Sequence, residues 1–277
     1  MAPVREVPPT TAVADVLALR GRTGWLSPPL RLVVGASAGP AGSTSGGDDD
    51  DRQPDAGSPP TRVVADGQSG AVLGRACTVE LRRGPGGFGP LYQLLSGDLT
   101  ARVLVLVAPD DDVAVWGELL STAAAQVGAT GVLVAGAVRD VAACQAVGVP
   151  LWASVVRTVG PAGGMETAAI GGPVTVGAVT VADGDLVVLD ADGVVALPAR
   201  PVTGAGPRTD DAGNTAAAEH QVAAARADDA DADAILAAAR AYADAESQVA
   251  AALRAGVPLR EAYRIKAEAV AQLARLG

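Results

Sequence analysis

The sequence predicts an α/β fold with a parallel strand–helix–strand core. Two apolar runs, 103–107 and 131–135, are short enough to be buried strands. Between them, from Trp116 onward, apolar residues recur at helical spacing as far as Gly128, which is placed to end the helix. Two buried strands joined by a helix form a right-handed crossover in a parallel sheet. Short strands within 174–197 predict a C-terminal β-meander.

Upstream of this core the sequence predicts one helix and two strands. Thr10 or Thr11 is placed to cap a helix over residues 12–20. The segments 30–34 and 71–81 are apolar enough to form strands, and the second of them re-enters the core.

The stretch between those two strands has the composition of a disordered insertion. Residues 36–69 are rich in Gly, Ser, Pro and Asp and include the aspartate run 48–51. Such a composition buries too little apolar surface to offset the loss of chain entropy. The run lacks the spaced ligands and terminal glutamate of a calcium loop, so it indicates a solvated acidic loop.

A glycine-rich turn follows the strand at 71–81. Its sequence GPGGFG, residues 84–89, formally satisfies the G-x-G-x-x-G pattern of dinucleotide-binding loops. Pro85 interrupts the turn, and no clear acidic end of a second strand follows about 20 residues later. The pattern favours a plain glycine turn leading to a short helix at 90–97.

The part of the chain after the core continues the α/β pattern. A short helix is expected at 141–147, ended by Gly148, and a strand at 151–155, after which Arg157 is expected on the surface. The meander strands are predicted at 174–181, 186–189 and 194–197, with the turn dipeptides Asp183-Gly184 and Asp192-Gly193.

Composition divides the chain into three parts. Residues 1–199 are predicted to form the α/β domain, and residues 200–230 read as a linker. Residues 231–277 are predicted to form a helical hairpin whose two alanine-rich helices are separated by Gly256 and Pro258. Such a hairpin could cover the domain or pack on a neighbouring subunit.

Charge and hydropathy exclude some classes of protein. The net charge of −10 disfavours nucleic acid as a partner, because a domain that binds it would show a basic patch. No run of about 18 uncharged apolar residues is present, and the N-terminus lacks a basic-then-apolar signal pattern. We therefore expect a cytoplasmic protein that is not bound to a membrane.

Scarce residue types limit the possible chemistry. The chain has one lysine, Lys266, one histidine, His220, and two cysteines, Cys77 and Cys144. His220 lies in a low-complexity stretch, and Lys266 is remote in sequence from the carboxylates of the core, which disfavours a catalytic triad and a Schiff base. A structural zinc site needs four nitrogen or sulfur ligands, and one histidine with two cysteines cannot supply them. Any metal should therefore be a hard cation, Mg²⁺ or Mn²⁺, held by carboxylates and water.

The core brings three charges to one edge of the sheet. From Glu118 the helix descends roughly 15 Å over about 10 residues, and the following strand climbs roughly 16 Å over about 5 residues. Arg139 and Asp140 therefore return to the level of Glu118, at the carboxyl ends of the strands, where ligands bind in open α/β sheets. The free amides of Gly117, Glu118 and Leu119 can hold an anion there. Alternatively, Arg139 and Asp140 form a surface pair, and Glu118 is a favourable first-turn acid.

The middle of the chain resembles the family of regulator of ribonuclease E activity A-like proteins, which includes the 4-hydroxy-4-methyl-2-oxoglutarate aldolases. The resemblance rests on AVWGELLSTAAAQVGATGVLVAGAVRD at 114–140, VGVPLWA at 147–153 and VTVADGDLVVLDADGVVALP at 179–198. An acid, twenty intervening residues and then Arg-Asp is that family's signature, and it is met by Glu118 and by the pair 139–140.

The resemblance implies a layered β/α fold of swivelling character, assembled as a homotrimer with sites between subunits. It implies a divalent-metal-dependent aldolase that cleaves a 4-substituted 2-oxoglutarate-type acid to pyruvate and a second keto acid, often with oxaloacetate decarboxylation. Carried over by position, Asp140 would bind the metal and Glu118 would act through metal-bound water. Arg139 would grip the keto acid, and the amides near Leu119 and Leu120 would hold its carboxylate.

The chemistry of these residue types agrees with that assignment. Breaking the carbon–carbon bond leaves an enolate, and without a usable lysine a bound cation is the available electrophile. The planar fork of Arg139 matches a carboxylate or keto acid. Two alternatives remain: a non-catalytic binding protein of the ribonuclease-regulator kind, and a family member that acts on an unrelated substrate.

Overall fold

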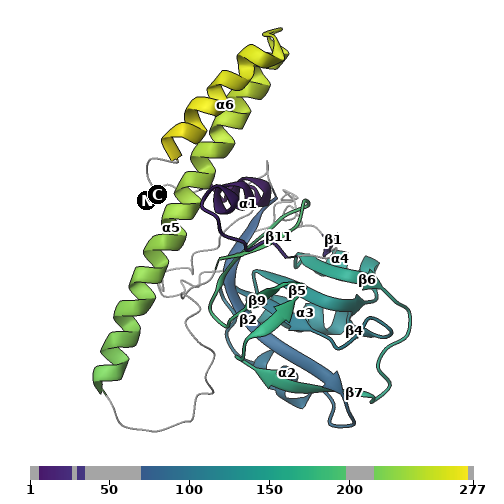
Figure 1. Cartoon of the computed structure of the whole chain (residues 1–277). Helices are drawn as coiled ribbons and strands as arrows, with labels where there is room; N and C mark the ends of the chain where they lie inside the picture. Colours follow the sequence, from purple (N-terminus) through teal and green to yellow (C-terminus); the bar gives the residue numbers. More distant parts are fainter. Residues whose placement is uncertain (1–5, 27–29, 35–69, 198–214, 274–277) are drawn as a thin grey trace, which may run out of the picture.

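The computed structural model describes residues 6–26, 30–34, 70–197 and 215–273 (Figure 1). The insertion predicted at 36–69 and the first part of the predicted linker lie outside these ranges. In chain order the elements are α1 (Thr10–Leu19), β1 (Arg31–Val34), β2 (Val72–Arg83), α2 (Gly89–Leu94), β3 (Arg102–Val107), β4 (Ala114–Trp116), α3 (Glu118–Gln126), β5 (Gly131–Val138), α4 (Val141–Val147), β6 (Leu151–Val156), β7 (Met165–Ile170), β8 (Val174–Val176), β9 (Val179–Val181), β10 (Leu186–Leu189), β11 (Val194–Leu197), α5 (Thr215–Arg254) and α6 (Leu259–Leu273).

A mixed nine-stranded sheet forms the centre of the domain. Its strand order is β1-β6-β5-β3-β2-β10-β11, with β4 added beside β5 and β7 beside β2. The neighbours β2, β3, β5 and β6 run parallel, and Val103 of β3 is in register with Gly131 of β5. The predicted parallel strand–helix–strand core is therefore confirmed as β3-α3-β5, and the α/β fold class with it.

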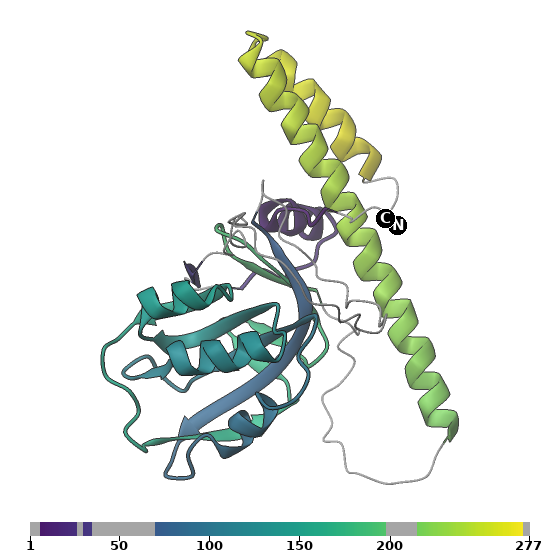
Figure 2. The same cartoon turned by 180° about the vertical axis from the view of Figure 1, so that it is seen from behind.

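Different layers cover the two faces of this curled sheet. Helices α2, α3 and α4 lie on one face, where Leu91, Ala124 and Cys144 join the buried cluster under Leu104 and its neighbours (Figure 2). The opposite face is covered largely by the small β8–β9 sheet, whose valines pack in a second cluster with inward side chains of β2, β3 and β5. The helices at the site thus pack on a sheet whose central strands β3 and β5 are almost entirely buried.

The C-terminal strands form two hairpins, one in each sheet. The single strand expected at 174–181 is wrong, because the chain reverses at Gly177, whose φ is 62°, and β8 pairs with β9. The strands β10 and β11 do form the predicted antiparallel pair around the Asp192-Gly193 turn. The sequence patterns did not predict the short strand β4, nor β7.

The first helix is anchored by a residue far away in the chain. Neither Thr10 nor Thr11 caps it as predicted: Thr10 is its first residue, and Pro9 is the N-cap without a side-chain bond. Instead Thr10 donates from its amide, 2.7 Å, and its hydroxyl, 2.5 Å, to the buried Asp190 carboxylate. Asp190 also accepts the amide of Asp192, so one carboxylate fixes both α1 and the β10–β11 turn.

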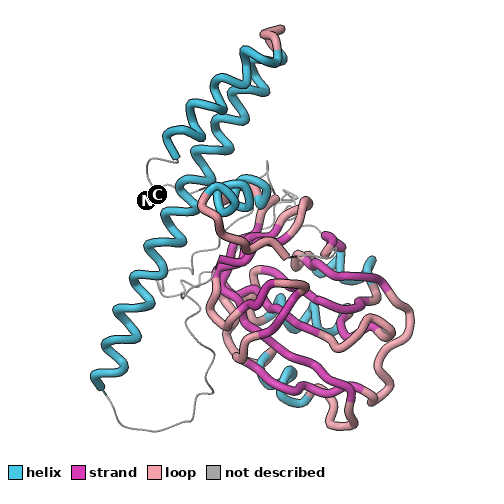
Figure 3. Tube along the Cα trace, in the orientation of Figure 1, coloured by secondary structure: helices cyan, strands magenta, loops and turns pink. Residues whose placement is uncertain are grey.

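A long helical hairpin lies beside the domain. Helix α5 begins at Thr215, so the second part of the segment predicted as a linker at 200–230 is helical instead. Ile235, Ala239 and Tyr242 of α5 pack in one buried cluster with α1 and β11. Beyond this contact α5 and α6 run side by side away from the sheet (Figures 1 and 3). Among the described residues no helix is long and apolar enough to cross a membrane.

Candidate functional site

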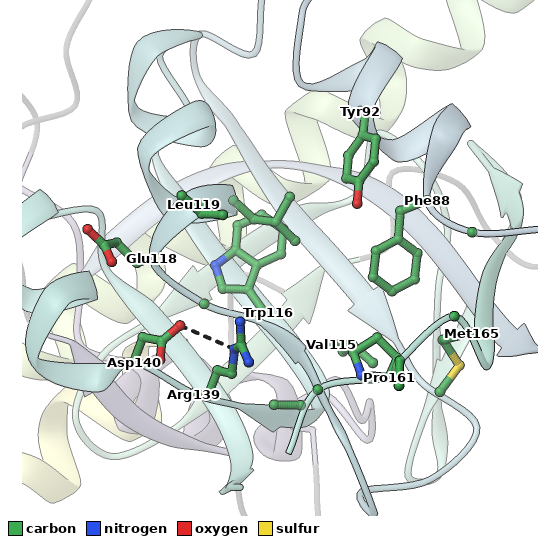
Figure 4. A pocket seen from close by; sticks show the side chains of 17 residues that line it. Phe88, Tyr92, Val115, Trp116, Glu118, Leu119, Arg139, Asp140, Pro161 and Met165 are labelled. Atoms are coloured by element: carbon green, nitrogen blue, oxygen red, sulfur yellow. Dashed lines mark ion pairs between the residues drawn. The ribbon is translucent and has the colours of Figure 1, made fainter. Parts of the chain in front are cut away.

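A cavity of about 490 Å³ opens where the carboxyl ends of β4 and β5 meet the beginning of α3 (Figure 4). Its walls also include the turn before α2 and the loop between β6 and β7. The lining residues are Gly87, Phe88, Tyr92, Ala114, Val115, Trp116, Gly117, Glu118, Leu119, Leu120, Arg139, Asp140, Gly160, Pro161, Ala162, Gly163 and Met165. All six residues that the sequence singled out for the site lie among them.

Arg139 and Asp140 follow directly on β5 at the cavity. The Arg139 amide donates to the carbonyl of Trp116, 2.9 Å, which ties the end of β5 to β4. The Arg139 Nε lies 3.2 Å from Asp140 Oδ2, and their side chains are 46% and 43% exposed. Asp140 has φ 56° and ψ 37°, in the left-handed region, and turns the chain into α4. Both charges thus remain accessible to a ligand.

The beginning of α3 lies against this ion pair. Gly117 is the N-cap, has extended backbone and provides no side-chain cap. Because the first amides of a helix have no intrahelical acceptor, those of Glu118, Leu119 and Leu120 are available as donors. A methyl group on Gly117 would come within 2.9 Å of Asp140 Oδ2 and 3.2 Å of Arg139 Cγ. The glycine therefore permits the close approach of α3 to the two charges.

Glu118 lines the same cavity from the first turn of α3. Its side chain is exposed, and among the described residues it forms no ion pair. Figure 4 shows Glu118 at the same end of the cavity as the Arg139–Asp140 pair. The three charged residues line one cavity, whereas their catalytic and metal-binding roles stay predictions.

A chain of buried hydrogen bonds lies beneath the charges. The Trp116 indole donates to the Ser121 hydroxyl, 2.8 Å, and that hydroxyl donates to Cys144 Sγ, 3.4 Å. The Cys144 thiol in turn lies 3.6 Å from the carbonyl of Arg139. These bonds connect β4, α3 and α4 to the peptide that carries the charged pair, so they hold it in place.

The protonation state of Cys144 suits this arrangement. Burial raises the pKa of the Cys144 thiol; the hydrogen bond from Ser121 opposes the shift, and the charges of Asp140 and Glu118 add to it. The thiol is therefore neutral at physiological pH and can donate to the Arg139 carbonyl. A neutral buried thiol is inert rather than a nucleophile.

The donors at this end of the cavity fit a hard cation that keeps much of its water. Asp140 and Glu118 supply carboxylate oxygens, and Mg²⁺ is typically bound through one or two carboxylates plus several waters. Within the described ranges no three His, Cys, Asp or Glu side chains come together as a metal-binding group. The residues present would therefore fit a cation only if water supplied most of its ligands.

Other residues considered from the sequence lie away from the site. Arg157 is exposed, does not line the cavity, and its Nη1 donates to the carbonyl of Val156, 3.4 Å. The Lys266 ammonium pairs with Glu246 of α5, 2.6 Å. His220 lies in α5, where its side chain is outside the described part.

The turn at 84–89 contributes to the cavity in an unexpected way. Its amide at Gly86 donates to Glu166 Oε2, 2.7 Å, and a Cβ on Gly84 would meet the same carboxylate at 2.5 Å. The turn therefore wraps a protein carboxylate of β7, as a plain glycine turn. Its Gly87 and Phe88 then line the cavity.

Sequence reasoning missed the apolar part of the site. Phe88, Tyr92 and Met165 come from segments that carry no shared motif, and the loop at 160–163 gave no signal beyond its glycine content. The one available signal was that Phe88 is the only phenylalanine of the chain.

The fold and this cavity are those of an α/β family with an acid and an Arg-Asp pair at the end of a parallel core. The sequence model of the RraA-like family, described as Aldolase/RraA, matches residues 50–196, more than half of the chain. The chain therefore belongs to the Aldolase/RraA family. No curated protein matches the chain.

Solved structures share this fold. An uncharacterized protein from Pseudomonas syringae pv. tomato str. DC3000 has a TM-score of 0.60 at 19% identity, over 92% of each chain. Streptomyces coelicolor RraAS2 is described as an unusual member of the RNase ES inhibitor RraA protein family. Its TM-score is 0.51 at 21% identity, and the match covers 69% of this chain and 81% of that chain. A protein described among novel cellulases from microbes associated with the gut ecosystem has a TM-score of 0.52 at 19% identity. That match covers 68% of this chain and 72% of the other. At these identities the likeness shows the fold alone.

Proposed function

We propose that this protein is a divalent-metal-dependent carbon–carbon lyase that cleaves 4-hydroxy-4-methyl-2-oxoglutarate-type keto acids to pyruvate, with accompanying oxaloacetate decarboxylation. The observation that carries the proposal is the Arg139–Asp140 pair, 3.2 Å apart, facing the uncapped start of α3 in one cavity. An arginine fork and free helix amides together suit a 2-oxo carboxylate. Membership of the Aldolase/RraA family supports the same class of reaction.

In this proposal Asp140 holds Mg²⁺ or Mn²⁺, and Glu118 assists through water. When bound, the cation supplies Lewis acidity that stabilises the negative charge of the developing enolate. One or two carboxylates completed by water are ligands that such cations accept.

The remaining groups bind and orient the substrate. Arg139 contacts the 2-oxo group, while the amides at Gly117, Leu119 and Leu120 receive the adjacent carboxylate. Glu118, which is not ion-paired among the described residues, accepts the proton of the 4-hydroxyl as the C3–C4 bond breaks. C4 then becomes a carbonyl carbon, and the bonding electrons pass to the other fragment as the enolate of pyruvate. That enolate takes a proton from water at its methylene carbon to give pyruvate.

An assembly and a chain organisation are proposed together with this function. The protein is proposed to be a cytoplasmic homotrimer with a small keto acid as its ligand and without nucleic acid or membrane partners. Within the chain, residues 1–199 would form the catalytic domain, and the helical appendage would begin with α5 at Thr215.

The test is pyruvate release from oxaloacetate and from 4-hydroxy-4-methyl-2-oxoglutarate with Mg²⁺, with and without a chelator. We expect turnover that the chelator abolishes and that Asp140→Asn lowers by at least about a hundredfold, since the carboxylate is the proposed ligand. Asp111→Ala, an exposed aspartate outside the cavity, is the matched control and should keep wild-type activity.

The alternative is a non-catalytic binding protein of the ribonuclease-regulator kind. Its support is the similarity in fold to RraAS2, which is described within the RNase ES inhibitor RraA family. Absence of turnover on both substrates, with Asp140→Asn indistinguishable from wild type in Mg²⁺ binding, would favour this alternative over the lyase.

A further inference from the structure

The cavity has a charged end and an apolar wall. Opposite Arg139 and Asp140 lie Phe88, Tyr92 and Met165, drawn together in Figure 4. The rings of Phe88 and Tyr92 are 6.2 Å apart at 87°, an edge-to-face contact that fixes both. Met165 is only 1% exposed, so it lies at the buried base of the apolar wall formed by these three residues.

The charge distribution does not suit a second carboxylate on the ligand. Arg139 is the one cationic side chain among the described residues that line the cavity, and it already faces Asp140. A ligand whose first carboxylate lies at the start of α3 would direct its far end toward the aromatic wall. A carboxylate there would lose its water without gaining a cation, which is costly. The charges of Asp140 and Glu118 would repel it as well.

The size of the cavity points to a ligand larger than pyruvate or oxaloacetate. Pockets of roughly 300–1,000 Å³ typically enclose ligands of drug-like size, and about 490 Å³ falls within that range. The space not needed by the 2-oxo acid adjoins the apolar wall.

Building on the proposed function, we infer that the natural substrate is a 2-oxo acid with a single carboxylate and an apolar substituent, aryl or branched alkyl, at C4. Phe88 and Tyr92 determine this specificity by packing against the substituent, while Arg139 and the α3 amides hold the 2-oxo carboxylate. The inference replaces the second carboxylate of 4-hydroxy-4-methyl-2-oxoglutarate and oxaloacetate by an apolar group, so these two acids serve as weaker surrogate substrates in the activity test. The step that breaks the C3–C4 bond stays as proposed.

Direct binding of ligands that cannot be cleaved tests the inference without depending on turnover. Calorimetry of the full chain with Mg²⁺ would compare 2-oxo-4-phenylbutanoate, 2-oxoglutarate and 2-oxobutanoate, which share the 2-oxo acid end and lack a 4-hydroxyl. We expect the phenyl compound to bind at least about tenfold more tightly than either of the others, because a phenyl group buries far more apolar surface than a methyl group. Equal or tighter binding of 2-oxoglutarate would overturn the inference.

Variants locate the preference on the apolar wall. Phe88→Ala and Tyr92→Ala should each raise the ratio of the phenyl to the 2-oxobutanoate dissociation constant toward one, and Phe88→Leu should restore part of the wild-type preference. Tyr92 is 55% exposed, so its substitution tests the wall even if Phe88→Ala folds poorly. Tyr263→Ala on α6, at 51% exposure, is the matched control and should leave the ratio unchanged.

The two proposals can fail separately. Pyruvate release from oxaloacetate together with no preference for the phenyl compound would overturn the inference and leave the lyase standing. A preference that Phe88→Ala abolishes, without pyruvate release from oxaloacetate, from 4-hydroxy-4-methyl-2-oxoglutarate or from 4-hydroxy-2-oxo-4-phenylbutanoate, would support the apolar subsite and remove the lyase. A wild-type preference that neither wall variant alters would overturn the inference, because another surface would then recognise the phenyl group.

Discussion

At the scale of single residues, Gly117 decides how closely α3 approaches the charged pair. Its extended φ of −173° is open to any residue, so its role is spatial. The atoms nearest a new Cβ are side-chain atoms, Asp140 Oδ2 at 2.9 Å and Arg139 Cγ at 3.2 Å. Side chains can rotate away, so Gly117→Ala should fold with nearly normal stability while the charged pair moves.

The expected result of Gly117→Ala is a loss of Mg²⁺ affinity by about tenfold or more, the range seen when groups that orient a metal ligand are disturbed. Calorimetry with Mg²⁺ measures it, alongside a thermal melt. The matched control is Gly172→Ala, because a Cβ there meets nothing within 4 Å and the backbone needs no positive φ. Equal Mg²⁺ affinity in both variants would show that the approach of α3 does not matter to the site.

Ser121 provides a test of the buried chain beneath the site. Ser121→Ala would leave the indole Nε1–H of the buried Trp116 without its acceptor. A buried donor without a partner costs about 1–3 kcal/mol, so the free energy of unfolding should fall by that amount in urea titrations. Ser96→Ala, an exposed serine at the end of α2, should change it by less than about 0.5 kcal/mol. If Ser121→Ala unfolded at the same urea concentration as the wild type, the hydrogen bond from the indole would contribute nothing to stability.

At the scale of elements, Lys266 joins the two helices of the C-terminal hairpin. Its ammonium lies 2.6 Å from Glu246 Oε1 and 4.8 Å from the centroid of the Tyr242 ring. The hydrogen bond to Glu246 raises the pKa of Lys266 above its ordinary 10.5, and the contact with Tyr242 adds to this. The side chains are partly exposed, so solvent screening limits the ion pair and the ring contact to roughly 1 kcal/mol together.

Replacing Lys266 by Met keeps the apolar stem and removes the charge. We expect amide exchange on α6 to quicken about fivefold, as roughly 1 kcal/mol implies, with no change in the parallel strands of the domain. Because the folded pKa is raised, the stabilisation is complete below pH 10.5 and is lost as the pH rises through the folded pKa. The difference in melting temperature between wild type and variant should therefore stay constant as the pH is raised to 10.5. The control is Arg260→Met, at an exposed position of α6, which should leave the amide exchange rates of α6 at their wild-type values.

At the scale of the whole molecule, the sequence predicted what depends on neighbouring residues in the chain. The β3-α3-β5 unit follows from local periodicity, and its residues 118, 139 and 140 line one cavity as expected. The expected equal lengths of helix and strand were wrong, because β5 continues beyond residue 135 to Val138, where it pairs with β4. The Thr10–Asp190 bond joins residues 180 positions apart, and no local pattern encodes it.

The apolar side of the cavity was unpredictable for the same physical reason. Its members come from α2, β7 and the loop between β6 and β7, so their proximity exists only after the sheet curls. Strand β4 has three residues and owes its conformation to pairing with β5, which no propensity over so short a span reveals. Charges at the ends of parallel strands can be placed from sequence, whereas the wall that faces them cannot.

The last prediction concerns the assembly. Val156 and Val159, near the carboxyl end of β6 and beside the cavity loop, are 51% and 61% exposed, and exposed apolar residues beside a site favour contact with another chain. We expect a light-scattering mass of three times 27.3 kDa, as proposed for a trimer of this family. Val159→Glu should lower the mass and, if the site lies between subunits, the activity with it. Leu259→Glu, 60% exposed on α6, should leave both unchanged. A wild-type mass of 27.3 kDa at micromolar concentration would contradict the trimer, and the cavity of one chain would then have to bind the keto acid alone.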